Sequence, residues 1–146
     1  MIITFCGHSD FYDSDNISTK LLDILNEVIN GENVEFFLGG YGRFDSFAYS
    51  IAMEYKKTHG NAKLVFVSPY QTESYLKNRV VGYDESIYPL ENKVPPRFAI
   101  SYRNKWMAEK ADIVIAYVKR ENGGAYQTLK HAEKAGKRII NIAKRT

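Results

Sequence analysis

The sequence predicts a single α/β domain: a doubly wound, Rossmann-like, mainly parallel sheet of five strands with helices on both faces. Short apolar runs alternate along the chain with segments of helical periodicity, which is typical of a βαβ series. Glycines punctuate most of the junctions between these segments. The 146 residues contain no internal repeat, low-complexity stretch or flexible linker. We therefore expect one unit over residues 1–146, without a domain boundary.

Five short runs of aliphatic, aromatic and β-branched residues are predicted as strands, because such residues suit a sheet buried on both faces. The runs occupy residues 2–6, 34–38, 63–67, 112–117 and 138–142. Residues 70–96 are rich in Tyr, Asn and Pro and carry no clear periodicity. We interpret them as an irregular insertion of the kind that often forms a lid or a binding loop.

Four segments between the strands are predicted as helices. The clearest shows a broad apolar stripe at helical spacing, formed by Phe44, Phe47, Ala48, Ile51, Ala52 and Tyr55. A shorter stripe over residues 21–29 is ended by Gly31. The third helix follows Pro95 and Pro96, and the fourth begins at the glycine pair 123–124 and ends before Gly136.

Composition is that of an ordinary globular protein, with 45% hydrophobic and 25% charged residues. No apolar run is long enough to span a bilayer, and the amino terminus lacks the basic region of a signal peptide. The single cysteine, Cys6, excludes an internal disulfide and is predicted to be a core residue. Three scattered histidines offer no metal-ligand spacing. We expect a cytoplasmic protein without metal, cofactor or membrane partner.

Two glycine-rich turns follow predicted strands at the carboxyl edge, where open parallel sheets bind their ligands. They lie at residues 39–42 and 123–124, and each leads into a helix. Glycine lets backbone amides approach an anion, and the helix dipole favours negative charge there. The turns therefore predict a nucleotide or nucleotide-like phosphate ligand; alternatively, they need glycine only for a tight bend. NAD is not expected, because Gly40-x-Gly42 matches only part of the dinucleotide fingerprint and follows the second strand.

The candidate ligand-binding residues gather at this predicted edge. They are Gly7, His8, Gly39, Gly40, Gly42, Arg43, Asp45, Ser68, Pro69, Arg103, Tyr117, Gly123, Gly124, Ala125 and Thr128. For His8 the alternatives are a phosphate or base contact and a bond to neighbouring backbone. Asp45 either caps amides in its helix or hydrogen-bonds a ribose hydroxyl. Arg103 lies on an apolar helix face, which predicts either a bound anion or a salt bridge to Glu109 or Asp112.

Three segments taken together resemble the SLOG superfamily, the Rossmann-like group that includes the Lonely Guy phosphoribohydrolases and DNA-processing protein A. They read TFCGH from residue 4, GGYGRFD from residue 39, and RNKWM from residue 103 followed by GGA at residues 123–125. The closest resemblance is to small stand-alone bacterial and phage members of the YpsA type. It implies a nucleotide-type ligand with Arg103 and Asn104 nearby. It also implies a homodimer or higher homo-oligomer, with Tyr102, Trp106 and Tyr126 as candidate interface residues.

Three functions follow from this resemblance. The first is a sensor-like nucleotide-binding protein, because no acid/base pair is evident. The second is a nucleoside 5′-monophosphate N-glycosidase. Family hydrolases have a Pro-Gly-Gly-x-Gly-Thr turn followed by a glutamate; here Lys130 takes that position, so Glu121 or Asp45 would have to supply the carboxylate. The third is single-stranded DNA binding, which draws only on fold analogy and a slight positive charge; a net charge of +3 spread along the chain is too small to predict a nucleic-acid footprint.

Overall fold

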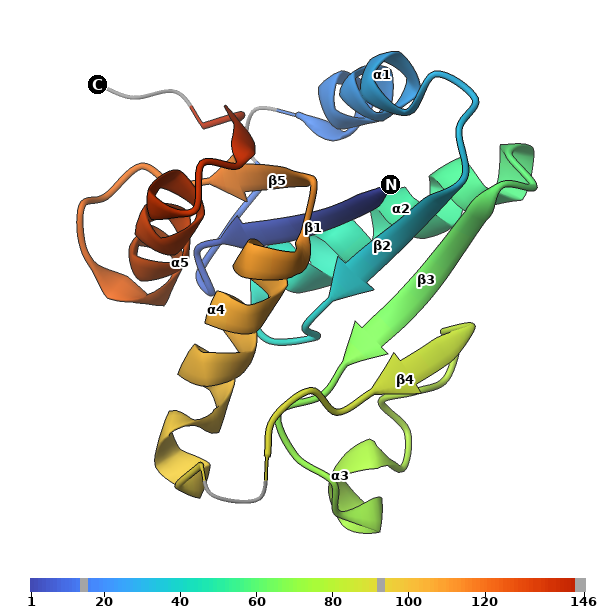
Figure 1. The fold of residues 1–146 in the computed structure, drawn as a ribbon. Coiled ribbons are helices and arrows are strands. Elements are labelled where there is room, and N and C mark those ends of the chain that lie inside the picture. Colours follow the sequence, from blue (N-terminus) through green and yellow to red (C-terminus); the bar gives the residue numbers. More distant parts are fainter. Residues whose placement is uncertain (14–15, 92–93, 144–146) are drawn as a thin grey trace.

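The computed structural model describes residues 1–13, 16–91 and 94–143. Its sheet has six strands in the order β4-β3-β2-β1-β5-β6 (Figure 1). The strands are β1 (Ile2–Gly7), β2 (Val34–Leu38), β3 (Ala62–Val67), β4 (Glu85–Ile87), β5 (Ile113–Tyr117) and β6 (Arg138–Asn141). Every neighbouring pair is parallel, which confirms the predicted α/β class.

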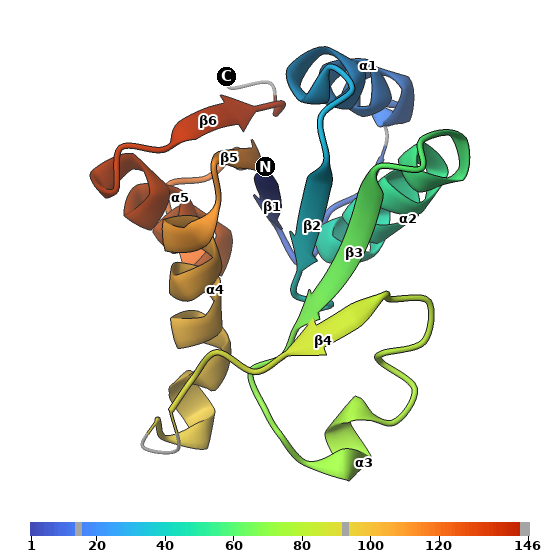
Figure 2. The same ribbon diagram turned by 45° about the vertical axis from the view of Figure 1, so that its right-hand side comes forward.

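Helices cover both faces of the sheet, as the turned view in Figure 2 shows. Helices α1 (Ser18–Ile29) and α2 (Arg43–Thr58) lie on one face, and α4 (Ala99–Lys110) and α5 (Gly123–Lys134) lie on the other. A short helix, α3 (Glu73–Leu76), follows β3, and the 3-10 turn η1 (Pro96–Phe98) leads into α4. No helix among the described residues is long and apolar enough to cross a membrane.

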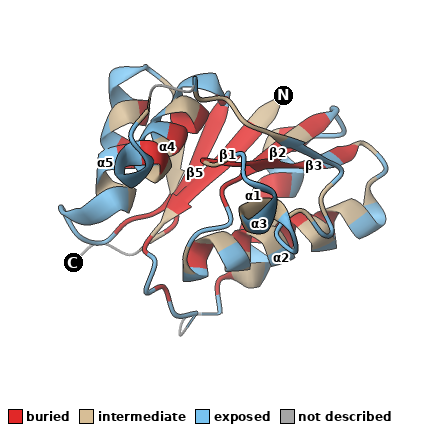
Figure 3. Cartoon of the chain, turned by 90° about the horizontal axis from the view of Figure 1, so that it is seen from below, coloured by how far each residue is buried: buried red, intermediate tan, exposed pale blue. Residues whose placement is uncertain are grey.

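The core lies on both sides of the central strands, so these strands appear as a buried layer in Figure 3. Side chains alternate along each strand. Thus Phe36 packs with Leu25 and Phe44 beneath α1 and α2, whereas Phe37 on the opposite face packs with Met107 of α4. Burial on both faces explains why β1, β2, β3 and β5 appear in the sequence as continuous apolar runs rather than alternating ones.

The expectation of five strands is wrong, because β4 forms inside the segment predicted to be irregular. Its three residues, Glu85 to Ile87, pair with Val65 to Val67 of β3. The carboxylate of Asp84 accepts a hydrogen bond from the amide of Leu64 (2.8 Å), and Lys63 pairs with Glu85. An exposed edge strand this short carries no apolar run, so it depends on its neighbour and leaves no periodic signal.

The chain order places a reversal point between β1 and β5. From β1 the chain moves outward through β2, β3 and β4, then returns to add β5 on the other side of β1. The connections leaving β1 and β5 therefore diverge, and a crevice opens between their carboxyl ends. In open α/β sheets ligands bind at this kind of switch point.

Candidate functional site

A cavity of about 480 Å³ opens at the switch point between β1 and β5. Its walls come from the turn after β1, the start of α2, the first half of α4 and the amino terminus of α5. Half of the predicted residues line it: Gly7, His8, Asp45, Asn104, Gly123, Gly124, Ala125 and Thr128. The structure thus places parts of both glycine-turn regions around a common space.

The other predicted residues lie outside the cavity lining. They are Gly39, Gly40, Gly42, Arg43, Ser68, Pro69, Arg103 and Tyr117. Tyr117 is buried in an aromatic cluster with Phe11 and Phe44, and Arg43 is exposed. Ser68 and Pro69 are buried beside the carboxyl end of β3. Glu121, one of the two carboxylates considered for catalysis, is exposed and does not line the cavity.

The turn before α2 is closed by contacts within the protein. The amide of Arg43 donates to the carbonyl of Ser9 (3.0 Å), and the amide of Tyr41 donates to Oδ2 of Asp45 (2.9 Å). Gly42 has φ 89° and ψ 172°, and a Cβ there would lie 2.8 Å from the Cα of Ser9. Glycine at this position is therefore explained by packing against the turn after β1. Two amides that were candidates for anion binding already have partners.

The turn before α5 is open. Its first residue, Gly123, has φ 87°, and a Cβ at Gly123 or Gly124 would meet no atom within 4 Å. Asn122 makes no side-chain cap, and the first turn of α5 contains no acidic residue. Among the described residues, none accepts a hydrogen bond from the amides of Gly123, Gly124 or Ala125. These donors, with the positive end of the helix dipole, face a cavity that an anion can enter.

His8 is buried against Tyr117, yet it lines the cavity. Its Nε2 lies 2.8 Å from the main-chain nitrogen of Lys119, which donates to it. Burial lowers the pKa of His8, and the charges of Arg120 and Lys119 lower it further against a smaller opposing effect of Asp10. The ring is therefore neutral at pH 7. The bond to backbone is thus present, and a phosphate or base contact by His8 stays a prediction.

Arg103 is completely buried on α4 and touches backbone rather than carboxylates. Its Nη1 donates to the carbonyls of Gly39 and Val67, both at 2.8 Å, and its Nε donates to Oδ1 of Asn104 at 2.9 Å. Its Nη2 is buried without a partner in the described structure. The predicted salt bridge to Glu109 or Asp112 is wrong, because the Asp112 carboxylate instead accepts from the amide of Ile2 (2.7 Å) and Glu109 pairs with Lys105.

Asp45 is the carboxylate of the cavity. It is half-buried in the first turn of α2, and burial raises the pKa of its carboxyl to about 6. The hydrogen bond from Tyr41 and the charge of Arg103 act in the opposite direction but are smaller. Oδ2 accepts the Tyr41 bond, while Oδ1 has no partner in the described part of the chain. One oxygen therefore holds the turn, and the other remains open to a ligand hydroxyl.

Two arginines that line the cavity were missed in the sequence. Arg120 follows β5 and pairs through both its Nη atoms with the Asp10 carboxylate, at 2.9 and 3.3 Å. Arg97 belongs to η1, and its guanidinium lies 4.7 Å from the ring centroid of Phe98. The sequence contained a signal for Arg120, because this residue lies in the short connection between β5 and α5, two residues before Asn122. Arg97 had none, because only tertiary packing brings η1 to the cavity.

Cys6 is a buried thiol. Burial raises the pKa of the Cys6 thiol to about 12, helped by the charge of Asp45, so the sulfur is protonated. This agrees with the interpretation of Cys6 as a core residue. The described residues contain no group of three or more His, Cys, Asp or Glu side chains that could hold a metal ion.

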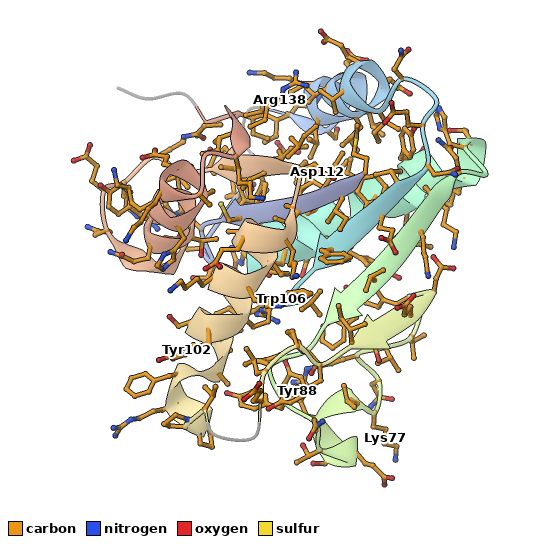
Figure 4. The ribbon with its side chains drawn as sticks, in the orientation of Figure 1. Lys77, Tyr88, Tyr102, Trp106, Asp112 and Arg138 are labelled. Atoms are coloured by element: carbon orange, nitrogen blue, oxygen red, sulfur yellow. The ribbon has the colours of Figure 1, made fainter. Side chains whose placement is uncertain are left out.

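The candidate interface aromatics differ in exposure. Trp106, labelled in Figure 4, lies between α4 and the sheet, where its ring stacks on Phe37 at a centroid distance of 5.8 Å and an angle of 4°. Tyr102 on the same helix is exposed, and Tyr126 is half-buried. Of the three aromatic side chains, Tyr102 is therefore the one that is exposed on the surface.

Comparison with known proteins identifies the fold. No protein-family model and no curated protein sequence matches the chain. Among solved structures, DNA processing protein A from Helicobacter pylori aligns over 95% of this chain with a TM-score of 0.64 and 14% identity. That structure is described in terms of a unique single-stranded DNA binding mode. DNA processing protein A from Streptococcus pneumoniae aligns over 94% with a TM-score of 0.64 and 17% identity. The chain has the Rossmann-like fold of DNA processing protein A.

The fold likeness extends to a third structure and is limited in extent. TM1055, a structural genomics target, aligns over 94% of this chain with a TM-score of 0.56 and 16% identity, and the match covers 71% of that protein. This chain spans 63% of the Helicobacter pylori protein and 48% of the Streptococcus pneumoniae protein. At these identities the likeness establishes the arrangement of strands and helices and nothing about the ligand.

Proposed function

We propose that the protein binds a nucleotide or nucleotide-derived ligand in the cavity, with a phosphate at the amino terminus of α5. The observation that carries the proposal is the open turn at Gly123 and Gly124, whose amides have no partner in the described structure. A helix amino terminus of this kind stabilises a phosphate through N–H donors and the helix dipole. Arg97 at the cavity adds positive charge, whereas the charge of Arg120 is already paired with Asp10.

The shape and the remaining polar groups also fit such a ligand. A volume of about 480 Å³ falls within the range of about 300–1,000 Å³ that is usual for small-molecule sites. The open oxygen of Asp45 is an acceptor suited to a ribose hydroxyl. The sensor-like role, the YpsA-type relationship, a homo-oligomer and a cytoplasmic location belong to the same proposal.

Isothermal titration calorimetry with AMP, CMP, GMP and cyclic nucleotides tests this proposal. The informative variant is Gly124→Asp, because a carboxylate in the first turn of a helix is favourable for stability but competes with a phosphate. We expect Gly124→Asp to keep the melting temperature and to lose nucleotide binding. Asn33→Asp, which changes the net charge equally at an exposed position before β2, is the matched control. Wild-type protein that binds none of the nucleotides would refute the proposal.

A second candidate is hydrolysis of the N-glycosidic bond of a nucleoside monophosphate. It is favoured by Asp45, a cavity carboxyl whose pKa of about 6 suits proton transfer near neutral pH. Incubation with AMP or dCMP followed by chromatography measures release of the free base. Under this candidate Asp45→Asn abolishes release and Glu121→Gln does not, since Glu121 lies outside the cavity lining. Binding without base release at any pH from about 5 to 8 assigns the site to recognition alone.

A third candidate, single-stranded DNA binding, is supported by the fold likeness to DNA processing protein A. Fluorescence anisotropy with a labelled oligonucleotide at physiological salt measures it directly. If DNA uses the same cavity, Gly124→Asp weakens oligonucleotide and AMP binding together, and AMP competes with the oligonucleotide. Oligonucleotide binding that persists in saturating AMP would place the DNA elsewhere on the surface.

A further inference from the structure

His8 lines the cavity with a side chain that is able to present either a donor or an acceptor. Its Nε2 lies 2.8 Å from the main-chain nitrogen of Lys119. A main-chain N–H only donates, so Nε2 must be the acceptor. The neutral ring therefore carries its proton on Nδ1, which has no partner in the described structure. A ligand atom that reaches Nδ1 of His8 therefore meets an N–H donor.

Asn104 is another such side chain of the cavity, and its orientation is set by Arg103. The Nε of Arg103 only donates, so the atom facing it at 2.9 Å must be the amide oxygen of Asn104. The Nδ2 group of Asn104, with two N–H bonds, then has no partner among the described residues. Arg103 is itself held by the carbonyls of Gly39 and Val67, at the ends of β2 and β3. The sheet thus fixes Arg103, and Arg103 fixes Asn104.

We propose that His8, Asn104 and the first turn of α5 form a donor-only wall, and that Arg103 is a positioning residue that acts on the ligand through Asn104. This inference rests on the proposed function and specifies the ligand group at the wall as an oxyanion without hydrogen, such as a phosphate ester. A neutral nucleoside lacks that group and binds at least a hundredfold more weakly than its monophosphate. Asp45 supplies the contrasting acceptor in the same cavity.

Asn104→Asp separates the effect on the ligand from the effect on the fold. The carboxylate keeps an oxygen for Nε of Arg103 and adds a counter-charge to a buried guanidinium whose Nη2 has no partner. We therefore expect a melting temperature at or above that of wild type. The same change replaces the N–H donors by a charged acceptor, so AMP affinity should fall at least a hundredfold. Affinity within threefold of wild type would overturn the proposal, and Asn33→Asp controls for net charge.

A double-mutant cycle tests the route from Arg103 through Asn104. Lysine at position 103 can still reach a strand-end carbonyl but lacks the planar guanidinium, whose Nε donates to the amide oxygen of Asn104. Arg103→Lys should weaken AMP binding about tenfold in wild type and less than twofold in the Asn104→Ala background. An equal loss in both backgrounds would show that Arg103 acts on the ligand directly or only through the fold. If Arg103→Lys does not fold, the Asn104→Asp comparison still decides the proposal.

The tautomer of His8 provides a readout that needs no ligand. A long-range ¹H–¹⁵N correlation spectrum distinguishes the two neutral forms, and the Nδ1–H form is expected. Observation of the Nε2–H form would overturn the donor-only wall. Should wild-type protein bind no nucleotide, the proposed function fails, whereas the His8 spectrum and the melting temperature of Asn104→Asp still report whether these side chains are oriented as proposed.

Discussion

Asp45→Asn should stabilise the protein at neutral pH and have little effect at acidic pH. The folded carboxyl has a pKa of about 6, compared with 3.8 for the free side chain. Below pH 3.8 the group is protonated in both states. Between 3.8 and 6 the folded state binds more protons than the unfolded state, so the free energy of unfolding falls as the pH rises, and above 6 the loss is complete. An asparagine does not ionise and therefore avoids this loss.

The size of the effect follows from the same two values. At about 1.36 kcal/mol per pH unit, the difference between 3.8 and about 6 corresponds to an upper limit of about 3 kcal/mol. Because the carboxyl is only half-buried and lines an open cavity, solvent screening reduces this, and we expect about 1–2 kcal/mol. Asparagine retains an oxygen to accept the Tyr41 amide, so the turn before α2 is preserved.

Urea unfolding of wild type and Asp45→Asn at several values from about pH 4 to pH 8 measures this. The difference in free energy of unfolding should be near zero at the acidic end and reach its plateau above pH 6. Glu54→Gln, which removes an exposed carboxylate from the same helix, controls for net charge. A difference that is the same at pH 4 and pH 7 would refute the assignment of Asp45 as a partly buried, destabilising charge.

Three further predictions test individual contacts. Gly42→Ala should lower the free energy of unfolding by about 1–3 kcal/mol, because residue 42 has a backbone conformation that is close to glycine-only and its new Cβ would meet Ser9. Gly124→Ala should leave the free energy of unfolding unchanged or raise it by up to about 1 kcal/mol, and chemical denaturation compares the two variants. Glu121→Gln should leave AMP affinity within about twofold of wild type in calorimetry, because its side chain is exposed outside the cavity lining. Asp112→Ala should cost about 0.5–1.5 kcal/mol in unfolding experiments, through loss of the bond to the Ile2 amide.

Most of the sheet was predictable because its central strands are buried on both faces. Such strands are largely apolar, with few interruptions such as Glu35 and Lys63, which makes them visible in a single sequence. β4 was not predictable for the opposite reason. Its residues are polar at two of three positions and gain their structure from pairing with β3 and from the Asp84 and Lys63 contacts. Those contacts are tertiary and leave no local pattern.

The sequence predicted the position of the cavity more accurately than the residues that line it. The rule that ligands bind beyond the carboxyl ends of parallel strands led to the turns after β1 and β5, where the cavity lies. It did not distinguish side chains that face the cavity from those that face the sheet. Arg103 illustrates the limit: its place on an apolar helix face predicted burial, but the sequence does not show that strand-end carbonyls would be its partners.

The two glycine turns appear equivalent in the sequence, yet their surroundings in the structure differ. At residues 39–42 the turn after β1 packs against the glycine turn. The carbonyl of Ser9 accepts a hydrogen bond from the Arg43 amide, and Ser9 leaves no space for a side chain at Gly42. At residues 123–124 a Cβ would meet no atom within 4 Å in the described structure, and Asn122 makes no side-chain cap bond to the helix. An uncapped helix start costs stability, by about 1 kcal/mol where Ser, Thr, Asn or Asp is absent from the cap role. A ligand anion at α5 would supply the missing partner, so the phosphate is expected there and the α2 turn serves to hold Asp45.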